Sequence, residues 1–298
     1  MWVRASAPLT ENVSQIVTAV SSHSLILGEH IALIDSSIGA VADTLLETLR
    51  AFIPAEQKLD TLLLTHGHFD HLGGVPFLRR AYPELEVIAS PQTAELVSDR
   101  SYLERCFEWN AHAAAAAQVE LSLKQEEWLN LFRVDRIVRD GDTVYLRGGV
   151  ELKVIASPGH TPDSLSFFVR PDGVVVGGEA LGGYHGRGKF SVCFSESYTE
   201  YLEALDKLSN LEVKAIVFSH CGALTGELAQ AYLTNARTEA EKLHGVITQR
   251  LESGEVVEEI TTGLYPELRD QNVLAEGPFA ELVEESIRRM VQVVAEGR

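Results

Sequence analysis

The 298-residue chain has only three cysteines, Cys106, Cys193 and Cys221. An odd number of widely separated thiols does not form the paired disulfide framework of small secreted domains, and it suits reduced thiols in a cytoplasm. We therefore expect a cytoplasmic protein in which Cys106 and Cys193 are small buried side chains. Cys221 follows a candidate metal ligand, but we expect packing to be its role as well.

Long apolar runs are also missing from the sequence. No stretch has the length and apolarity of a membrane span. The first twenty residues are interrupted by Arg4 and Glu11 and lack the apolar core of a signal peptide. The sequence predicts neither a membrane partner nor a targeting segment.

Basic residues are scarce: 25 Lys and Arg stand against 43 Asp and Glu, for a net charge of -18. Such a field repels nucleic-acid phosphates and anionic lipid, so we expect no nucleic-acid partner. The sequence also has no Gly-x-Ser-x-Gly elbow, which gives no support to a serine nucleophile. Hydrophobic content of 45% and this length fit one large globular domain, or a domain with an appendage.

A dense cluster of metal-binding side chains follows the apolar run Leu62-Leu63-Leu64. It consists of His66, His68, Asp70 and His71, in the spacing H-x-H-x-D-H. Alternate residues leaving a strand point the same way, and the start of a helix presents the last two donors. Burying four such groups merely as packing would cost too much in desolvation. The cluster therefore predicts a site for two neighbouring cations.

The order of the predicted elements indicates an α/β (α+β) fold. Helical spacing predicts helices at 40–52, 72–81 and 198–208. Apolar runs bounded by turn signals predict a hairpin at 24–35 and strands at 59–65, 86–89, 142–146, 151–156, 165–170, 174–176 and 215–218. Strands alternating with helices favour sheets with helices packed on their faces.

Two stretches have a wholly helical pattern. The first predicts a helical insertion at about 93–134. The second predicts a helix that stops near Gly254 and another that starts at Pro278. We therefore expect one domain at 1–224 and a C-terminal helical appendage at 225–298 that covers the site.

Three more candidate ligands each follow an apolar strand. They are His160 in a Pro-Gly-His-Thr loop, Glu179 after a pair of glycines, and His220. Active sites are often built from loops at strand ends, so these three residues join the cluster as a set of seven.

This arrangement resembles the metallo-β-lactamase superfamily over residues 20–222. The resemblance implies an αββα sandwich of two mixed β-sheets flanked by helices. It also implies a dinuclear metal centre with a bridging carboxylate between two groups of ligands: His66, His68 and His160, and Asp70, His71 and His220.

Further features resemble particular branches of that superfamily. The stretch 158–164 is similar to that of glyoxalase II and related thioesterases. The insertion and helical tail resemble in layout the PqsE-like thioesterases of the quinolone-signal response, which implies small acyl esters or thioesters as substrates. Glu179 stands where the family usually has an aspartate, and it is longer by about 1.5 Å. It could bridge both ions, bind one, or leave the second site weak.

Several residues near the seven candidate ligands are weaker candidates for a role in the site. Asp35 ends an apolar strand and could hydrogen-bond a liganding histidine, or simply terminate the strand. His185 could line the pocket, although an exposed loop histidine more often has no role. Tyr184 could stabilise an oxyanion. Arg187 and Lys189 form a small basic cluster that could attract a carboxylate or a CoA phosphate.

The sequence thus predicts a metal-dependent hydrolase that cleaves an ester or thioester with a metal-activated water. Asp70 is the expected catalytic residue, which ligates the second ion and orients the nucleophile. The expected cofactors are two divalent ions, and zinc, iron and manganese all suit these ligands. The alternatives are a regulatory protein with a retained metal site, a lactonase, β-lactamase or phosphodiesterase, and an iron-dependent oxygen-using enzyme of the same fold. A homodimer is left open.

Overall fold

The structure of the chain is a computed structural model that describes residues 1–269 and 280–298. Its first sheet has seven strands in chain order. The strands from β2 to β5 are antiparallel, and those from β5 to β8 are parallel. Their bounds are β2 (Ala7–Pro8), β3 (Val13–Val17), β4 (Ser22–Ile26), β5 (Ile31–Ile34), β6 (Leu59–Leu63), β7 (Glu86–Ala89) and β8 (Arg136–Ile137).

The second sheet also has seven strands, in the order β1-β16-β15-β12-β11-β10-β9. It is mixed, because β12 and β15 are parallel while the other neighbours are antiparallel. Its strands are β1 (Trp2–Val3), β9 (Thr143–Tyr145), β10 (Glu151–Ala156), β11 (Leu165–Arg170), β12 (Val174–Val176), β15 (Ala215–Val217) and β16 (Ala223–Thr225). A separate hairpin pairs β13 (Gly183–Tyr184) with β14 (Phe190–Ser191).

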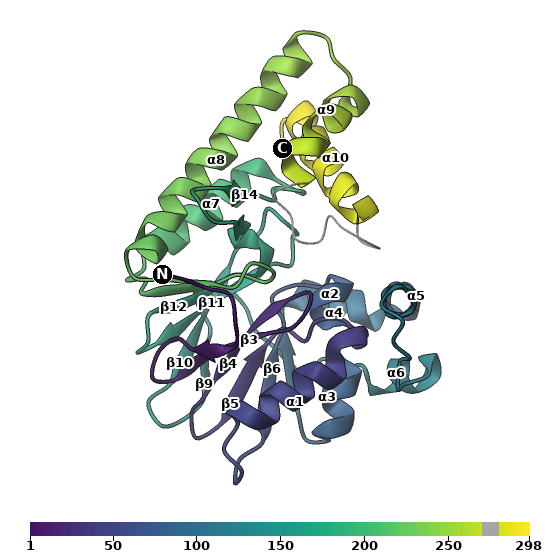
Figure 1. Ribbon diagram of the computed structural model, residues 1–298, viewed down its shortest axis with the longest axis vertical. Helices are drawn as coiled ribbons and strands as arrows, with labels where there is room; N and C mark the ends of the chain where they lie inside the picture. Colours follow the sequence, from purple (N-terminus) through teal and green to yellow (C-terminus); the bar gives the residue numbers. More distant parts are fainter. Residues whose placement is uncertain (270–279) are drawn as a thin grey trace.

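Helices cover the outer face of each sheet. Figure 1 shows α1 and α3 beside the first sheet, and α7 and α8 beside the second. The helices are α1 (Ala42–Phe52), α2 (Phe69–Leu72), α3 (Val75–Ala81), α4 (Pro91–Ser98), α5 (Arg100–Ala116), α6 (Gln125–Leu131), α7 (Tyr198–Ser209), α8 (Glu227–Glu252), α9 (Val257–Arg269) and α10 (Ala280–Glu296), with short 3-10 turns η1 (Gly39–Val41) and η2 (Gly178–Leu181).

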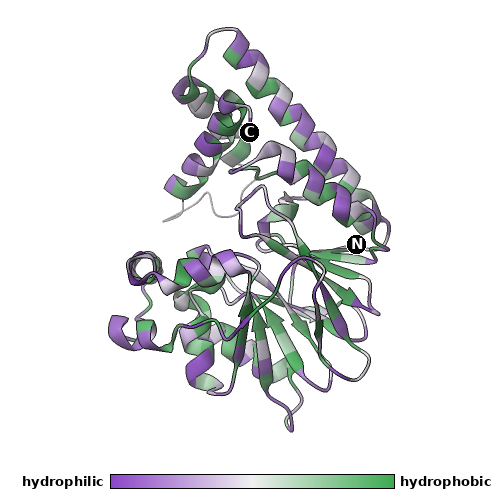
Figure 2. Cartoon of the chain, turned by 180° about the vertical axis from the view of Figure 1, so that it is seen from behind, coloured by the Kyte–Doolittle hydropathy of each residue, from purple (hydrophilic) through white to green (hydrophobic). Residues whose placement is uncertain are grey.

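The central strands of each sheet bury both of their faces, which explains their near-continuous apolar sequences. In β5, Leu33 packs with the helices outside the sheet, while Ile34 packs between the sheets. In β11, Phe168 packs with the helices outside the sheet, while Phe167 packs between the sheets. Because side chains alternate across a strand, each strand supplies two hydrophobic layers. Figure 2 shows the resulting apolar strands, with hydrophilic residues on the helices around them. The predicted αββα sandwich is therefore confirmed.

Some element boundaries differ from the sequence-based prediction. The helix expected at 72–81 is two helices, α2 and α3, separated at Gly73 and Gly74. The chain comes very close to another segment there, since a Cβ on Gly74 would lie 2.1 Å from the carbonyl oxygen of Ser36. The start of a helix at Pro278 falls outside the described residues.

Other elements were not expected from the sequence. Strands β1 and β2 were missed because each is two residues long and carries little periodicity. Strand β3 was missed as well, because the polar Ser14 and Gln15 interrupt its apolar sequence. Helix α9 was missed because Pro266 lies inside it, and proline normally ends a helical pattern. Within residues 1–269 and 280–298, none of the helices is both long and apolar enough to cross a membrane.

Candidate metal centre

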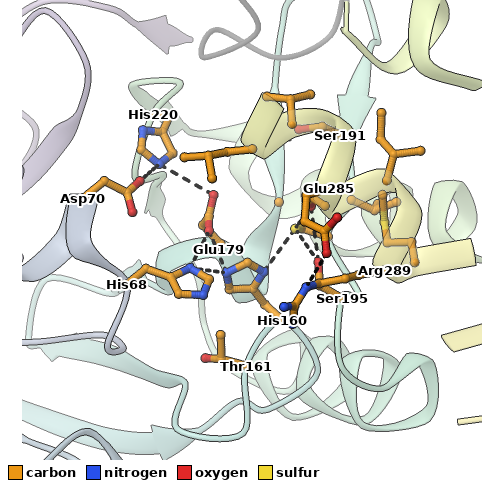
Figure 3. A pocket seen from close by; sticks show the side chains of 18 of the residues that line it. His68, Asp70, His160, Thr161, Glu179, Ser191, Ser195, His220, Glu285 and Arg289 are labelled. Atoms are coloured by element: carbon orange, nitrogen blue, oxygen red, sulfur yellow. Dashed lines mark hydrogen bonds and ion pairs between the residues drawn. The ribbon is translucent and has the colours of Figure 1, made fainter. Parts of the chain in front are cut away.

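The seven predicted donors meet at one edge of the sandwich, where strands of both sheets end. The first four come from the loop after β6 and from α2, which begins immediately afterwards. His160 lies between β10 and β11, Glu179 in η2 after β12, and His220 between β15 and β16. Figure 3 shows five of these side chains directed toward one another from their separate loops: His68, Asp70, His160, Glu179 and His220.

One group of donors surrounds an oxygen of Glu179. Its Oε2 lies 2.7 Å from His160 Nε2, 3.7 Å from His66 Nε2 and 3.8 Å from His68 Nδ1. One ligand atom from each of these four residues lies within 4.8 Å of the others. His68 Nδ1 is also 3.2 Å from His160 Nε2. Three imidazoles and a carboxylate at these separations match the four-donor sets that hold zinc and related ions.

A second group lies directly beside the first. Asp70 Oδ2 is 3.4 Å from His220 Nε2 and 3.8 Å from His71 Nε2. The other oxygen of Glu179, Oε1, is 3.6 Å from His220 Nε2. The Glu179 carboxylate therefore turns one oxygen toward each group, the orientation that a bridging carboxylate needs.

Hydrogen bonds at the outer nitrogens orient the histidines. His220 Nδ1 donates to the carbonyl oxygen of Val20 at 2.8 Å, and His71 Nδ1 donates to Asp35 Oδ2 at 2.8 Å. Because Nδ1 carries the proton in each ring, the Nε2 lone pair is directed into the site.

His66 is held by Thr65. The Thr65 hydroxyl donates to Asp35 Oδ2, so it accepts from His66 Nδ1 at 3.0 Å. This arrangement again leaves Nε2 as the free acceptor of the ring.

The inner nitrogens have no hydrogen-bond partner among the described residues. The Nε2 atoms of His66, His71 and His220 are buried without a hydrogen bond to any described residue. A buried polar nitrogen without a partner is costly, and native structures rarely tolerate three together. Divalent cations between the two groups would satisfy all three atoms, so the residues present fit a pair of metal ions.

The charges of the centre favour a cation as well. Burial opposes ionisation of Asp70, but His71 and His220 outweigh burial and lower its pKa to about 2. Burial likewise opposes ionisation of Glu179, yet His160 beside it brings its pKa well below the usual value.

The histidines respond in opposite ways. Burial and the neighbouring imidazoles of His71, His68 and His160 lower the pKa of His66 well below 6.5. For His71, burial is outweighed by the Asp35 and Asp70 carboxylates, which raise its pKa to about 9. The centre therefore holds ionised carboxylates that need positive charge beside them, which bound cations can supply in place of protons.

Asp35 and Asp163 build the frame of the centre. Asp35 Oδ1 accepts from the backbone N–H of Thr65 at 2.8 Å, in addition to its bonds through Oδ2. Asp163 Oδ2 accepts from the N–H of Gly67 at 2.7 Å and from the Thr93 hydroxyl at 2.7 Å, which fixes the loop between His66 and His68. Asp35 thus has the histidine-bonding position considered from the sequence. Asp163 was not singled out, although it lies in the Pro-Gly-His-Thr-Pro-Asp-Ser stretch.

Glycine is required where Glu179 enters the site. Gly178 has a φ of +54°, and a Cβ there would lie 2.8 Å from Thr65 Oγ1. Only a residue without a side chain brings the η2 turn this close to the end of β6.

A cavity of about 410 Å³ opens over the centre. His68, Asp70, His160, Glu179 and His220 lie at its base. Its other side is lined by α10, mainly through apolar side chains: Leu282, Val283, Ile287 and Met290.

The expectation that Cys193 is a small buried side chain is wrong. Cys193 is half-buried, lines this cavity, and its Sγ lies 3.0 Å from His160 Nδ1. Its residue type alone carried no sign of this contact, which depends on the loop after β14. Cys106 and Cys221 are buried, as expected.

His185 and Tyr184 have different surroundings. His185 lines the cavity, with its Nε2 2.9 Å from the Ser191 hydroxyl. Tyr184 packs edge-on against Trp2 and does not line this cavity, so its position gives no support to an oxyanion role.

Comparison with known proteins places the chain in a family. The sequence profile of the metallo-beta-lactamase superfamily matches residues 17–220. An atrochrysone carboxyl ACP thioesterase of Aspergillus fumigatus is 26% identical over 55% of this chain and 40% of its own length. A hydroxyacylglutathione hydrolase of Erwinia tasmaniensis is 28% identical over 41% of this chain and 34% of its own length. The chain thus matches less than half of the length of either relative.

Solved structures of the same superfamily share this fold. A metallo-beta-lactamase family protein of Thermus thermophilus, TTHA1429, superposes with a TM-score of 0.63 at 19% identity, over 93% of this chain and 89% of that protein. The matched profile includes strands of both sheets and all seven donors. The chain is a member of the metallo-beta-lactamase superfamily.

Proposed function

We propose that this protein hydrolyses an ester or thioester of a small acyl compound at a centre of two divalent metal ions. The observation that carries the proposal is the pair of donor groups with Glu179 between them, in which three buried nitrogens lack any other partner. The thioesterase and the hydroxyacylglutathione hydrolase among the relatives support the thioester class.

His66, His68 and His160 would hold one ion, Asp70, His71 and His220 the other, and Glu179 both. When bound, such ions lower the pKa of a water molecule toward 7 and polarise a carbonyl oxygen. Zinc, iron and manganese all suit these ligands.

Asp70 has a second role in the proposed reaction. Its Oδ2 faces His220 and His71, and Asp70 also lines the cavity. An ionised carboxylate at this place can accept a hydrogen bond from the attacking water and hold it in line with the carbonyl carbon. Asp35, Thr65 and Val20 act indirectly, since they keep the imidazoles in one tautomer and one orientation.

The cavity suits an acyl group with apolar character. Leu282, Val283, Ile287 and Met290 of α10 face the proposed metal centre across it. We further propose that the helical tail covers the site, with α10 as the wall that limits the size of the acyl group. His68, whose side chain is 44% exposed, would lie next to the reacting carbonyl.

The test is hydrolysis of a panel of acyl thioesters and esters by protein loaded in turn with zinc, iron and manganese. We expect turnover with at least one metal, its loss on chelation and its return on reloading. His66→Ala removes a buried donor and should abolish turnover, whereas His112→Ala changes an exposed histidine of α5 and should not. A panel with no turnover under any metal would contradict the proposed function and favour the regulatory alternative.

A further inference from the structure

A second cavity, of about 700 Å³, adjoins the first on the side of His220. The two share five lining residues: Val20, Ile38, His185, His220 and Cys221. The second cavity extends between the N-terminal segment, the β13–β14 hairpin and the end of α5, where Ala113, Ala116 and Ala117 line it. The proposed metal centre therefore lies at the junction of two cavities, which suits a substrate with an arm on each side of the scissile bond.

The two cavities differ in charge. Besides the proposed ligands, the first is lined by the carboxylates of Glu196 and Glu285, and its one arginine, Arg289, is paired with Glu285 at 3.4 Å. No Asp or Glu among the described residues lines the second cavity, although the chain has 43 of them. Its one charged lining residue is Arg4. Of the two linings, that of the second cavity is therefore the better suited to an anionic group.

Arg4 lies on an aromatic surface and has no acidic partner in the described part of the chain. Its guanidinium is 4.8 Å from the centre of the Trp2 ring. Trp2 is fixed in turn, because its Nε1 donates to the carbonyl oxygen of Cys221 at 2.7 Å and its ring packs against Tyr184. A cation held over a ring without a counterion keeps its hydrogen-bond donors available for a ligand.

The β13–β14 hairpin carries two more basic residues, Arg187 and Lys189, which are exposed and line neither cavity. Gly186 at its turn packs against Trp2, since a Cβ there would lie 2.9 Å from the ring. Lys189 is paired with His185 through the backbone: the backbone N–H of His185 donates to the carbonyl oxygen of Lys189 at 3.0 Å. Burial lowers the pKa of His185 to about 4, and the Lys189 ammonium adds to this shift. Arg187 lies between His185 and Lys189 in the sequence and is exposed at the hairpin turn.

We infer that the second cavity binds the leaving-group arm of the substrate, and that this arm is a phosphorylated thiol of the coenzyme A type. Arg4 would contact the phosphates, the exposed hairpin residues Arg187 and Lys189 would add positive charge from outside the cavity lining, and the acyl group would occupy the apolar cavity under α10. This inference rests on the proposed function and adds to it the class of the leaving group. Arginine contacts phosphate with paired donors, and an adjacent lysine adds a point charge.

The first experiment measures binding without turnover. Desulfo-coenzyme A has the phosphates and the arm but no thiol to coordinate a metal, and its affinity can be measured by calorimetry on the metal-loaded protein. We expect Arg4→Gln to weaken binding about three- to tenfold, and Arg4→Gln with Lys189→Gln to weaken it further. Arg139→Gln is the matched control, because Arg139 is exposed, forms no ion pair with a described residue, and lines neither cavity.

A second pair of variants tests the cavity by its shape. Ala116→Trp places a large ring in the second cavity, whereas Ala115→Trp adds the same ring at an exposed neighbour that lines neither cavity. We expect the first to weaken desulfo-coenzyme A binding and the second to leave it unchanged. Equal binding by wild type, Arg4→Gln and Ala116→Trp would overturn the inference, as would weakening by Arg289→Gln alone.

A kinetic comparison separates this inference from the proposed function. One acyl group is presented on pantetheine, on phosphopantetheine and on coenzyme A. We expect kcat/KM to rise at least tenfold from the uncharged to the phosphorylated thiols, and this ratio to fall toward one in Arg4→Gln with Lys189→Gln. Turnover without any such preference would contradict the inference and leave the proposed function intact. If none of the three thioesters is hydrolysed but desulfo-coenzyme A still binds through Arg4, the proposed function is contradicted and the inferred phosphate site stands.

Discussion

Glu179 is the residue whose role distinguishes one metal site from two. Its oxygens face different donor groups, at 2.7 Å from His160 and 3.6 Å from His220. Of the three possibilities that the sequence left open for Glu179, we propose the bridge, because its second oxygen lies beside His220.

Replacing Glu179 with alanine should lower the metal content from two ions toward one and reduce turnover by at least a hundredfold. The loss follows because a bridging carboxylate belongs to both coordination shells and neutralises both cations. Elemental analysis of the dialysed protein, together with thioester hydrolysis, measures both effects.

Glu196→Ala is the control for this change. Glu196 lines the same cavity, but its carboxylate pairs with Arg298 at the surface. Two ions and full turnover in Glu179→Ala would show that this carboxylate does not bridge.

His23 should make the folded state sensitive to acid. Burial lowers its pKa from 6.5 to about 4, and the His71 imidazole adds to this while the Asp35 carboxylate opposes it. Between those two pH values the unfolded chain binds the proton and the folded protein does not, so stability falls as the pH drops. Over the whole window the effect is on the order of 3 kcal/mol.

The measurement is urea unfolding at pH 7.5 and pH 5, at equal metal content, for wild type and His23→Gln. We expect the variant to lose less free energy of unfolding between the two pH values, whatever its stability at pH 7.5. His112→Gln, at an exposed position, should behave as wild type. A His23→Gln protein with the full wild-type loss would rule out His23 as the source.

At the scale of elements, the ends of β5 and β6 are joined through one carboxylate. Asp35 follows β5 and accepts from both the backbone and the hydroxyl of Thr65, which follows β6, as well as from His71. Asp35 has a φ of +61°, a conformation that aspartate adopts more readily than most residues. Neighbouring parallel strands therefore hold two of the proposed ligands in place.

Asp35→Asn should weaken metal binding about 10- to 100-fold, because the His71 and His66 imidazoles lose the partner network that orients them. Competition with a chromophoric chelator measures the change. Asp60→Asn is a matched control, since Asp60 Oδ2 also accepts a backbone N–H between β6 and the start of β5, at 2.8 Å from Ile31 N. An equal loss of affinity in both variants would mean that only general destabilisation is observed.

Helix α10 should set the size of the acyl group. Leu282→Trp fills part of the cavity, so we expect kcat/KM to fall at least tenfold for long acyl chains and little for acetyl. Glu281→Trp places the same ring on the exposed neighbouring residue and should keep the wild-type profile. Identical acyl profiles for both variants would indicate that α10 does not border the acyl site.

At the scale of the molecule, the sequence was sufficient where the pattern was local and repeated. Apolar strands and amphipathic helices predicted the layers, and the spacing of His66 to His71 predicted the cluster. Contacts between segments distant in sequence could not be read in this way. The bond from Gly67 to Asp163 depends on how the second sheet packs on the first. The approach of Cys193 to His160 and the pairing of Met1 to Val3 with residues 223–225 each join segments that are distant in sequence.

The net charge of -18 does not describe the charge at every site on the molecule. The acidic excess is spread over the molecule, while the second cavity is lined by Arg4 and by no described carboxylate. Long-range repulsion of anions thus coexists with a local site that accepts them. Raising the ionic strength screens both the repulsion and the local attraction, so we expect it to weaken desulfo-coenzyme A binding more in wild type than in Arg4→Gln with Lys189→Gln.

The central claim is a two-metal centre that performs hydrolysis, and native mass spectrometry combined with turnover of the same samples tests it most directly. Protein is stripped with a chelator and then titrated with zinc, iron or manganese. We predict that two ions bind per chain and that thioester hydrolysis appears with the second ion. Protein that binds no metal under any of the three conditions, or that hydrolyses thioesters equally well when stripped, would contradict the account.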